Sequence, residues 1–386
     1  MRGEVCVTGI GISRLGKDTG LTEGQLAVEA ARRALADAHL QATDVDGLAM
    51  FPYRGSPPSA FSGPDLSHVQ RALGINSLRW AQSTTVENGQ LGAVVAAVTA
   101  LLAGLCDHAL VYRAHKRQTR RYLPHTTDVS LAYDEDAFTI PYGAGGGSAR
   151  GALWAARHMH VYGTTQEDFG RVCVNARAHA ATNERAVWRE PITLDQYLDS
   201  RWICTPLKVL DCDYPIDGAT ALIFSRAGVA GGTRKPVLVD SVGAGPGPSL
   251  SWSGWVEKSE MASRYAAESM WSHTSLTPAD VDVAELYDGF SYFTLCWLED
   301  LGLVAKGQAG QFFRAGGGPL GSKLPVNTDG GQLGMGRLHG FGKVAEAVAQ
   351  LRGEAVNQVD GAEVAVATAG GGPGCVSLLL RAGQVR

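Results

Sequence analysis

The feature that most constrains the fold of this chain is an internal repeat. Each half begins with a strand-like run, continues with an amphipathic helix, and passes through Asp-Val-Asp into a second apolar strand, at residues 44–46 and 280–282. Apolar residues at i, i+3 and i+4 of the helical segments indicate helices that pack one face on a sheet. Alternating strands and helices, repeated in this way, predict an α/β fold.

The repeat continues with a glycine turn, a helix of small residues and a buried strand. In the first half these are residues 88–114, and in the second half residues 330–353 followed by 361–371. Helices rich in Ala and Gly suit burial on all sides, because their small side chains let neighbouring backbones approach closely. The sequence therefore predicts duplicated βαβαβ halves that form a five-layer α/β/α/β/α core.

We expect three regions along the chain. Residues 1–114 form the N-terminal half and residues 233–386 form the C-terminal half. Residues 115–232, which are richer in loops, arginines and aromatics, form an inserted region whose end returns to the sheet of the first half. Loops on a rigid scaffold commonly carry binding residues, so the insertion is the expected substrate-binding region.

Composition narrows the class of protein. The chain has 386 residues and a net charge of −4, which favours neither nucleic acid nor an anionic membrane as a partner. No apolar run approaches the ~20 residues of a membrane span, and the start of the chain does not read as a signal peptide. The seven cysteines are odd in number and form no Cys-x-x-Cys pair, so we expect reduced thiols and no metal site in this chain. These observations favour a cytoplasmic enzyme.

Several segments resemble one enzyme family. They are a Tyr-Asp-Gly-Phe segment within 285–303, a glycine-rich segment at 327–342, a glycine triplet within 368–375, and a middle region at 151–186 and 200–227. Together they resemble the thiolase superfamily, and within it the lipid-transfer-protein (sterol-carrier thiolase) branch, over nearly the whole chain. The resemblance implies the thiolase fold.

The resemblance breaks at the positions that carry thiolase chemistry. Val86 stands where thiolases have the nucleophilic cysteine, and a valine cannot form an acyl-enzyme. Thr368 replaces the second cysteine, although a threonine hydroxyl is a far weaker acid than a thiol with a pKa of about 8.5. Arg337 and Tyr287 replace the two family histidines. Thiolysis is therefore not the expected activity.

The pattern resembles the cysteine-less steroid side-chain aldolases of the same superfamily. That resemblance implies retro-aldol cleavage of a β-hydroxyacyl-CoA, of the 17-hydroxy-20-carboxyl-CoA type, to a 17-ketosteroid and propionyl-CoA. A base takes the β-hydroxyl proton, the Cα–Cβ bond breaks, and hydrogen-bond donors stabilise the thioester enolate. Two alternatives remain: a thiolase-like acyltransferase or condensing enzyme that uses Ser83, Thr84 or Thr85, and a catalytically inactive scaffold subunit.

The candidate catalytic residues are Tyr287, Asp288, Arg337 and His339. Tyr287 would be the acid or base, unless it is a tyrosine of the core; a phenol with a pKa of about 10 needs nearby cations to act as a base, or else acts as a donor. His339 would relay a proton or orient the tyrosine, or be structural. Arg337 would hold enolate charge or lower the pKa of Tyr287, or form a structural ion pair with Asp288.

The expected substrate- and CoA-binding residues lie mostly in glycine-rich turns: Tyr142, Asn88, Gly89, Gly370, Gly371 and Gly372. The glycine triplet would let the backbone approach the thioester and donate to an oxyanion. The related aldolases use a second tyrosine, for which Tyr142 and Tyr292 are the options here. The basic run at 113–121 would meet the phosphates of coenzyme A, or would be a solvated face.

The resemblance also implies partners. We expect a homodimer through the sheet and helices of the N-terminal half, joined by a small zinc-ribbon/OB-fold protein into a heterotetramer. Coenzyme A enters as part of the substrate, no cofactor is bound by this chain, and any zinc belongs to the partner.

Overall fold

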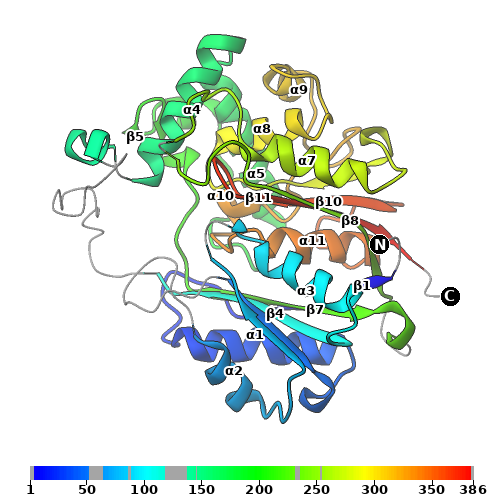
Figure 1. The fold of residues 1–386 in the computed structure, drawn as a ribbon. Coiled ribbons are helices and arrows are strands. Elements are labelled where there is room, and N and C mark those ends of the chain that lie inside the picture. Colours follow the sequence, from blue (N-terminus) through cyan, green and yellow to red (C-terminus); the bar gives the residue numbers. More distant parts are fainter. Residues whose placement is uncertain are drawn as a thin grey trace.

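The computed structural model describes residues 4–51, 64–85, 88–117, 137–144, 146–230, 235–252 and 254–383. Figure 1 shows five layers: two stacked parts of sheet, helices between them, and helices on both outer faces. The predicted α/β/α/β/α core is confirmed.

Hydrogen bonds join all the strands of this core into one nine-stranded sheet, so the two stacked layers are parts of a single sheet. In sheet order, the first part contains β3 (Trp80–Ser83), β2 (Gly47–Met50), β4 (His108–His115), β7 (Gly218–Arg226) and β1 (Val5–Ile12). The second part contains β8 (Val237–Gly245), β11 (Cys375–Ala382), β10 (Val364–Ala369) and β9 (Val283–Glu285). The parts meet at β1 and β8, where Cys6 pairs with Leu238 and Val7 pairs with Val237. β7 comes from the end of the inserted region and lies between β4 and β1.

Helices cover both faces of each part of the sheet. From one outer face to the other they are α1 (Glu23–Asp37) and α2 (Leu66–Leu73), then α3 (Gly92–Leu102) and α11 (Phe341–Arg352) in the centre, then α7 (Ala262–Ser272) and α8 (Ser291–Asp300). Both central helices contact strands of both parts. The C-terminal half also contains α9 (Ala309–Arg314) and α10 (Gly331–Gly334).

The inserted region packs mainly on the C-terminal half (Figure 1). Its elements are η6 (Ile140–Tyr142), α4 (Gly147–Tyr162), α5 (Gln166–Thr182), α6 (Leu194–Leu198), η7 (Val209–Asp211) and the pair β5 (Trp202–Cys204) and β6 (Leu207–Lys208). α5 contacts α8, α9 and α10, so it lies against the segments on either side of the candidate catalytic residues.

Glycines let the outer helices approach the strands closely in both halves. A Cβ atom on Gly11 of β1 would lie 2.1 Å from the carbonyl oxygen of Ala30 in α1. A Cβ atom on Gly243 of β8 would lie 1.9 Å from the carbonyl oxygen of Ala266 in α7. Both positions therefore require glycine, and the repeated requirement supports the duplication.

The Asp-Val-Asp steps serve the same purpose in both halves. Each step begins at the last residue of a short 3-10 turn, η1 (Ala42–Asp44) or η9 (Pro278–Asp280). The second aspartate then accepts two backbone N–H groups at or just before the start of the neighbouring strand: Asp46 accepts from Asp107 at 2.9 Å and His108 at 2.8 Å, and Asp282 accepts from Glu363 at 2.8 Å and Val364 at 2.9 Å. These charge-assisted bonds tie β2 to β4 and β9 to β10.

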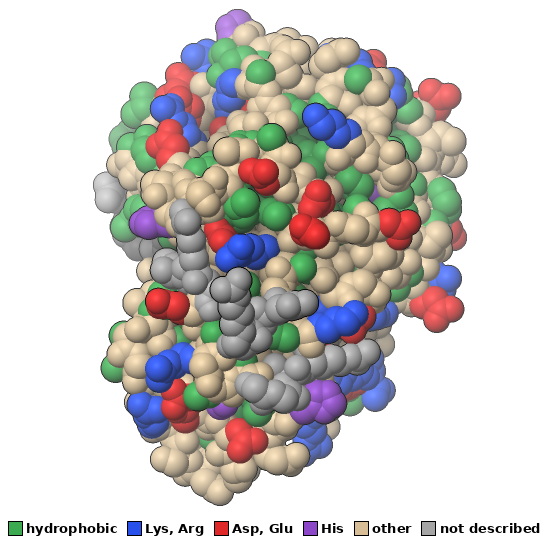
Figure 2. Space-filling view, turned by 90° about the vertical axis from the view of Figure 1, so that its right-hand side faces the viewer, with side chains coloured by type: hydrophobic (Ala, Val, Ile, Leu, Met, Phe, Trp, Pro, Cys, Tyr) green, Lys and Arg blue, Asp and Glu red, His purple; other side chains and the backbone are tan. Residues whose placement is uncertain are grey.

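No helix in the described ranges combines the length and apolar character that a membrane span needs. On the face in Figure 2, basic and acidic side chains are interspersed, and neither sign forms a continuous block. This surface gives no support for an electrostatic docking face for nucleic acid or an anionic bilayer.

Candidate active site

Tyr287 lies where the two halves of the chain meet. It follows β9, is only 5% exposed, and donates its backbone N–H to Thr368 Oγ1 at 2.8 Å. Its hydroxyl oxygen accepts a hydrogen bond from Gln90 Nε2 at 2.7 Å, although Gln90 belongs to the first half. Thr368 occupies the position of a thiolase cysteine. Its hydroxyl accepts the backbone N–H of Tyr287 and so fixes the backbone there.

The surroundings of Tyr287 keep its phenol protonated. Burial raises the pKa of Tyr287 above its ordinary value, and the carboxylate of Asp213 raises it further. Gln90, Arg337 and Gln332 lower the pKa but do not cancel this effect. Of the two roles predicted for Tyr287, a donor or acid is therefore the one that its electrostatics favour.

Arg337 forms a two-point ion pair with Asp213. Its Nε lies 2.8 Å from Asp213 Oδ2, and its Nη2 lies 2.5 Å from Asp213 Oδ1. The predicted alternative, an ion pair between Arg337 and Asp288, is wrong. Asp288 instead pairs with Lys343 Nζ at 3.0 Å and accepts the N–H of Gln332 at 3.0 Å. Asp288 thus supports the glycine-rich turn, while Arg337 and Asp213 both act on Tyr287.

His339 is buried and neutral. Its backbone has a φ of 51°, and its N–H donates to Gln332 Oε1 at 2.9 Å. Its Nδ1 accepts a hydrogen bond from Arg113 Nε at 3.2 Å, so the ring proton belongs on Nε2. Burial lowers the pKa of His339 well below its ordinary value, and the charge of Arg113 lowers it further. His339 is therefore a fixed N–H donor rather than a cation.

The glycine loop after β10 contacts the turn that contains Asn88 and Gly89. A Cβ atom on Gly89, which has a φ of 75°, would lie 2.8 Å from the carbonyl oxygen of Gly374. Within the triplet, the carbonyl of Gly370 accepts from Trp297 Nε1 at 3.0 Å, and the N–H of Gly372 donates to Met261 Sδ at 3.5 Å. Both halves therefore contribute backbone to one junction. A role of Gly371 N–H as oxyanion donor stays a prediction.

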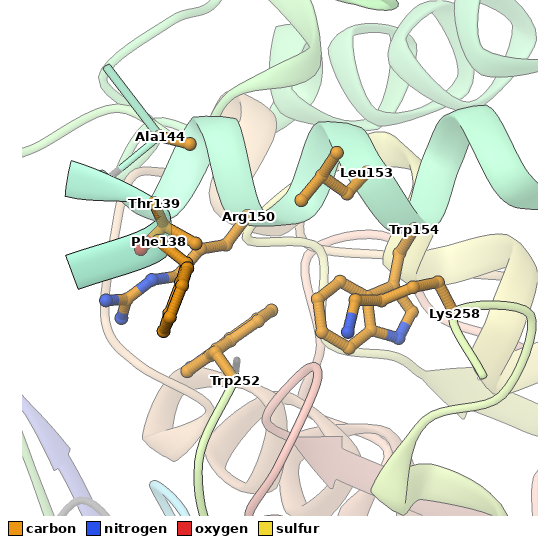
Figure 3. Close-up of a pocket in the computed structure, with 8 residues that line it drawn as sticks. All are labelled: Phe138, Thr139, Ala144, Arg150, Leu153, Trp154, Trp252 and Lys258. Atoms are coloured by element: carbon orange, nitrogen blue, oxygen red, sulfur yellow. The ribbon is translucent and has the colours of Figure 1, made fainter. Parts of the chain in front are cut away.

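A cavity of about 240 Å³ adjoins this loop (Figure 3). Its lining comes from the residues that flank η6, from α4, and from the segment before α7: Phe138, Thr139, Ala144, Arg150, Leu153, Trp154, Trp252 and Lys258. A Cβ atom on Gly372 would meet the ring of Trp252 at 2.5 Å, which places the cavity beside the triplet. Figure 3 shows Trp252 opposite Phe138 and Lys258 lying along Trp154, with the lysine ammonium 4.4 Å from the ring centre of that tryptophan.

Aromatic rings connect the cavity with Tyr287. The ring centre of Phe293 is 6.5 Å from that of Trp252 and 6.1 Å from that of Tyr287, on which it stacks at 23°. The predicted binding residue Tyr142 lies in η6, close in sequence to the lining residue Thr139, and is 82% exposed. The cavity combines aromatic walls with two cationic side chains, which suits a thin, partly apolar chain that ends in phosphate.

Tyr292 borders this arrangement from the core, with its ring centre 5.9 Å from that of Phe293. It is fully buried in α8, with its ring centre 5.5 Å from that of His158 and 6.3 Å from that of Phe169. Neither Tyr142 at the surface nor Tyr292 in the core contacts the hydroxyl of Tyr287. In the described part of the chain, no second tyrosine is hydrogen-bonded to Tyr287, so neither candidate takes the place of the second tyrosine that the resemblance implied.

The basic run at 113–121 does not form one exposed surface. Arg113 is buried beside His339. Lys116 binds Asp217 at 3.0 Å, and Arg120 and Arg121 lie outside the described residues. The described part of the run is therefore divided between the site and the scaffold.

The described cysteines provide no activated thiol near the glycine loop. Cys375 borders this loop, is 1% exposed, and donates its thiol to the carbonyl of Gly372 at 3.7 Å. Burial raises the pKa values of Cys375 and Cys212 well above their ordinary value. A buried, protonated thiol is a poor nucleophile. Val86, at the thiolase nucleophile position, lies outside the described residues.

Two of the three hydroxyl groups proposed as substitute nucleophiles, those of Thr84 and Thr85, donate to neutral oxygen atoms among the described residues. Thr84 Oγ1 donates to the carbonyl of Met50 at 3.2 Å, and Thr85 Oγ1 donates to Asn88 Oδ1 at 3.1 Å. Neither contact is with a histidine or carboxylate that would activate the hydroxyl. Over the described ranges, the structure likewise contains no group of three or more side chains suited to hold a metal ion.

Three residues around Tyr287 and His339 were not predicted from the sequence: Gln90, Gln332 and Asp213. A fourth, Arg113, was predicted only as part of the basic run that would meet the coenzyme A phosphates. One signal could have found the two glutamines, because Gly-Gln-Leu-Gly occurs at 89–92 and again at the equivalent place in the second half. No comparable signal marked the other two. Arg113 sits in a run that reads as a charged surface, and Asp213 is 124 residues from its partner Arg337.

Comparison with known proteins agrees with this geometry. Residues 252–379 match the family model described as "Thiolase C-terminal domain-like". The chain is 37% identical to the "17-hydroxy-3-oxo-4-pregnene-20-carboxyl-CoA lyase" of Mycobacterium tuberculosis, over 98% of this chain and 100% of that protein. It is 35% identical to the "Steroid side-chain-cleaving aldolase" of Thermomonospora curvata, over 98% of each.

A solved structure, "Ltp2-ChsH2(DUF35) aldolase", superimposes with a TM-score of 0.89 at 34% identity, over 99% of this chain and 98% of that one. The human mitochondrial 3-ketoacyl-CoA thiolase, with a TM-score of 0.69 at 16% identity, supports the fold alone. The chain belongs to the thiolase superfamily, in the branch of the steroid side-chain-cleaving aldolases.

Proposed function

We propose that this chain is an aldolase that cleaves a steroid side-chain CoA thioester of the 17-hydroxy-20-carboxyl-CoA type into a 17-ketosteroid and propionyl-CoA. The observation that carries the proposal is its similarity, over nearly the whole length of both chains, to a 17-hydroxy-3-oxo-4-pregnene-20-carboxyl-CoA lyase. The site agrees, because Val86 and Thr368 stand where thiolysis would need its two thiols, and Tyr287 and Arg337 stand where it would need its two histidines.

The reaction needs one proton acceptor and one proton donor, and no acyl-enzyme. Removal of the β-hydroxyl proton breaks the Cα–Cβ bond, the electron pair moves into the thioester as an enolate, and a proton returned to Cα gives propionyl-CoA. Tyr287, held protonated by burial, is the group that we assign to donate to the enolate. His339 Nε2–H adds a neutral donor.

The proton acceptor for the β-hydroxyl is then a different group. We assign Asp213, because it is the carboxylate whose charge acts on Tyr287 and because burial raises its pKa above its ordinary value. Arg337 holds both carboxylate oxygens of Asp213 and so fixes its orientation. Asp288 is assigned to support of the turn rather than to the reaction.

Coenzyme A enters with the substrate. The cavity beside the glycine triplet is the proposed place for part of its pantetheine arm, with Trp154 and Trp252 as walls and Arg150 and Lys258 toward the phosphates. This arrangement would bring the thioester to Gly370, Gly371 and Gly372.

We further propose a homodimer through the N-terminal half. The edge strand of that half, β3, exposes Ala81, Gln82 and Ser83, whereas the opposite edge strand, β9, is buried along its whole length. An open strand edge favours pairing with another copy. A DUF35 protein, which accompanies the solved relative "Ltp2-ChsH2(DUF35) aldolase", would complete a heterotetramer, with any zinc in a zinc-ribbon/OB-fold domain of that partner and not in this chain. The cytoplasm is the proposed compartment.

The test is turnover of 17-hydroxy-3-oxo-4-pregnene-20-carboxyl-CoA by the purified chain, with and without a DUF35 partner, followed by mass spectrometry of products and protein. We expect a 17-ketosteroid, propionyl-CoA and no covalent adduct. Tyr287→Phe should lower kcat by about 10²–10⁴-fold while circular dichroism stays unchanged. A covalent acyl adduct would instead identify an acyltransferase, and the absence of turnover with the partner present would identify a scaffold.

A further inference from the structure

Two glutamines at equivalent positions of the repeat converge on one tyrosine. Gln90 is the second residue of Gly-Gln-Leu-Gly at 89–92, and Gln332 is the second residue of Gly-Gln-Leu-Gly at 331–334. Both motifs precede a central helix, α3 or α11. The duplication therefore places a glutamine from each half beside Tyr287, although the two residues are far apart in sequence.

The hydrogen bonds indicate the orientation of each glutamine amide, that is, which side Oε1 and Nε2 each face. Gln332 Oε1 accepts the N–H of His339 at 2.9 Å, which leaves Gln332 Nε2 as the other end of the amide. That Nε2 is buried without a hydrogen-bond partner within 3.5 Å among the described residues, yet the amide lies close enough to Tyr287 to lower its pKa. Gln90 Nε2 donates to the hydroxyl oxygen of Tyr287 at 2.7 Å, and Gln90 Oε1 is buried without a partner there.

An ordinary buried tyrosine would donate its proton to a neighbouring acceptor in the protein. Here the Gln90 amide donates to the phenol oxygen at 2.7 Å, and the Gln332 amide acts on the same phenol to lower its pKa. An oxygen that accepts from amide N–H groups keeps its own O–H for another group. Donors aimed at this oxygen also stabilise the phenolate that remains after proton transfer, against the effect of burial. The pair thus suits a tyrosine that gives its proton to a ligand.

We propose that Gln90 and Gln332 are positioning residues: an amide pair, one from each half, that accepts no proton from Tyr287 and directs its O–H toward the substrate. The proposal deepens the aldolase function and rests on it for its kinetic consequences. Its structural content, which atom of Tyr287 accepts and which donates, is independent of the substrate.

The test compares Gln90→Leu, Gln90→Glu and Gln350→Leu. Gln90→Leu removes one donor, and Gln90→Glu replaces the donor with a carboxylate that accepts the phenol proton. Gln350, a buried glutamine of α11 that bonds to the carbonyl of Asn357 at 2.8 Å, is the matched control for loss of a buried amide. We use Gln90 rather than Gln332 because Gln332 also holds the backbone of His339.

The first readout needs no substrate. The tyrosine Fermi doublet in the ultraviolet Raman difference spectrum, wild type minus Tyr287→Phe, distinguishes a phenol oxygen that accepts hydrogen bonds from an O–H that donates. We expect the accepting pattern in wild type, a weaker one in Gln90→Leu, a donating pattern in Gln90→Glu, and no change in Gln350→Leu. A donating pattern in wild type would overturn the proposal, even if the chain proves to have another activity.

The second readout is kinetic. We expect kcat to fall about 10–100-fold in Gln90→Leu with KM within about twofold, and to fall further in Gln90→Glu, because the loss affects the transition state rather than binding. Gln350→Leu should lose stability but keep kcat. If Gln90→Glu were more active than Gln90→Leu, Gln90 would be a proton acceptor and the inference would be wrong. A wild type with no aldolase turnover would refute the proposed function but leave the Raman result to decide the amide pair.

Discussion

The N-terminal and C-terminal halves share a scaffold but differ in their central helices. In both, an aspartate ties two strands together, Asp46 in the first and Asp282 in the second. α3 of the first half contains no ionisable residue, whereas α11 of the second buries Lys343 and carries Glu346 against the same network. The difference shows that the central helix of the first half is apolar, whereas that of the second half brings buried charges next to the segments that carry Tyr287.

The buried charged side chains of the C-terminal half form one connected group next to the segment that carries Tyr287. Lys343 lies 3.0 Å from Asp288, and Thr328 Oγ1 lies between Glu285 Oε1 at 2.7 Å and Glu346 Oε1 at 2.8 Å. Burial raises the pKa values of Glu285 and Glu346, and the charge of Lys343 partly offsets this for Glu285. The C-terminal half should therefore respond to pH in a way that the N-terminal half does not.

The largest effect on stability is expected from Lys343→Met. It leaves Asp288 buried without its cation, which should lower the free energy of unfolding by about 3–5 kcal/mol. Denaturant unfolding at pH 5 and pH 8 measures it, and the loss should be smaller at pH 5, where Glu285 takes up a proton more easily once the lysine is gone. Leu101→Ala in α3, at about 2–5 kcal/mol, is the control, and its loss should be the same at both pH values. Equal pH dependence in the two variants would contradict the contrast between the halves.

The matched pair Asp46→Ala and Asp282→Ala comes next. Each variant leaves two backbone N–H groups without their carboxylate, so each should lose about 2–3 kcal/mol of unfolding free energy. Only Asp282→Ala should also lower kcat, by about tenfold, because β9 and β10 carry Tyr287 and Thr368. Chemical unfolding and steady-state kinetics on the same samples provide the measurement. A similar loss of kcat in Asp46→Ala would show that the two halves share the catalytic task more evenly.

Glu346→Gln tests the pH response directly. Burial raises the pKa of Glu346 to about 7 in the folded state, above its ordinary 4.5. The folded protein therefore binds this proton more tightly, so the contribution to stability is fully present below about pH 4.5 and is lost as the pH rises through 7. Because the side chain retains some solvent contact, we expect a difference of about 1–2 kcal/mol. Unfolding free energy measured from pH 4.5 to 7.5 should fall less in Glu346→Gln than in wild type; parallel curves would exclude this group as the source.

The smallest effect on the isolated fold is expected at the open edge of the first half. Ala81→Lys combined with Gln82→Lys places two charges on β3, which should weaken the proposed dimer at least tenfold, about 1.4 kcal/mol, with little change in the secondary structure. Light scattering across a dilution series gives the dissociation constant. Arg157→Gln, at an exposed ion pair with Glu257 on the inserted region, is the control and should leave the dimer unchanged. Dimers that persist in the β3 variant would place the interface elsewhere.

Local patterns were enough to predict the scaffold. The repeated Asp-Val-Asp step, the small-residue helices and the glycine turns each determine a short stretch of backbone, and the structure has them where the repeat requires. The site was harder, because its chemistry depends on contacts between distant segments. Nothing in the neighbourhood of Arg113 in sequence reveals that it enters the core against His339, and nothing near Arg337 identifies Asp213 as its partner. The protonation of Tyr287 likewise depends on burial, which its own segment does not display.

The short pairing between β1 and β8 has a consequence for unfolding. β1 is bonded on one side to β7, in the first part of the sheet, and on the other side to β8, in the second part. α3 and α11 each contact strands of both parts. Unfolding of either half alone would remove packing partners of β1, α3 and α11. Calorimetry should therefore record a single unfolding transition, because the two halves of the repeat can no longer unfold independently.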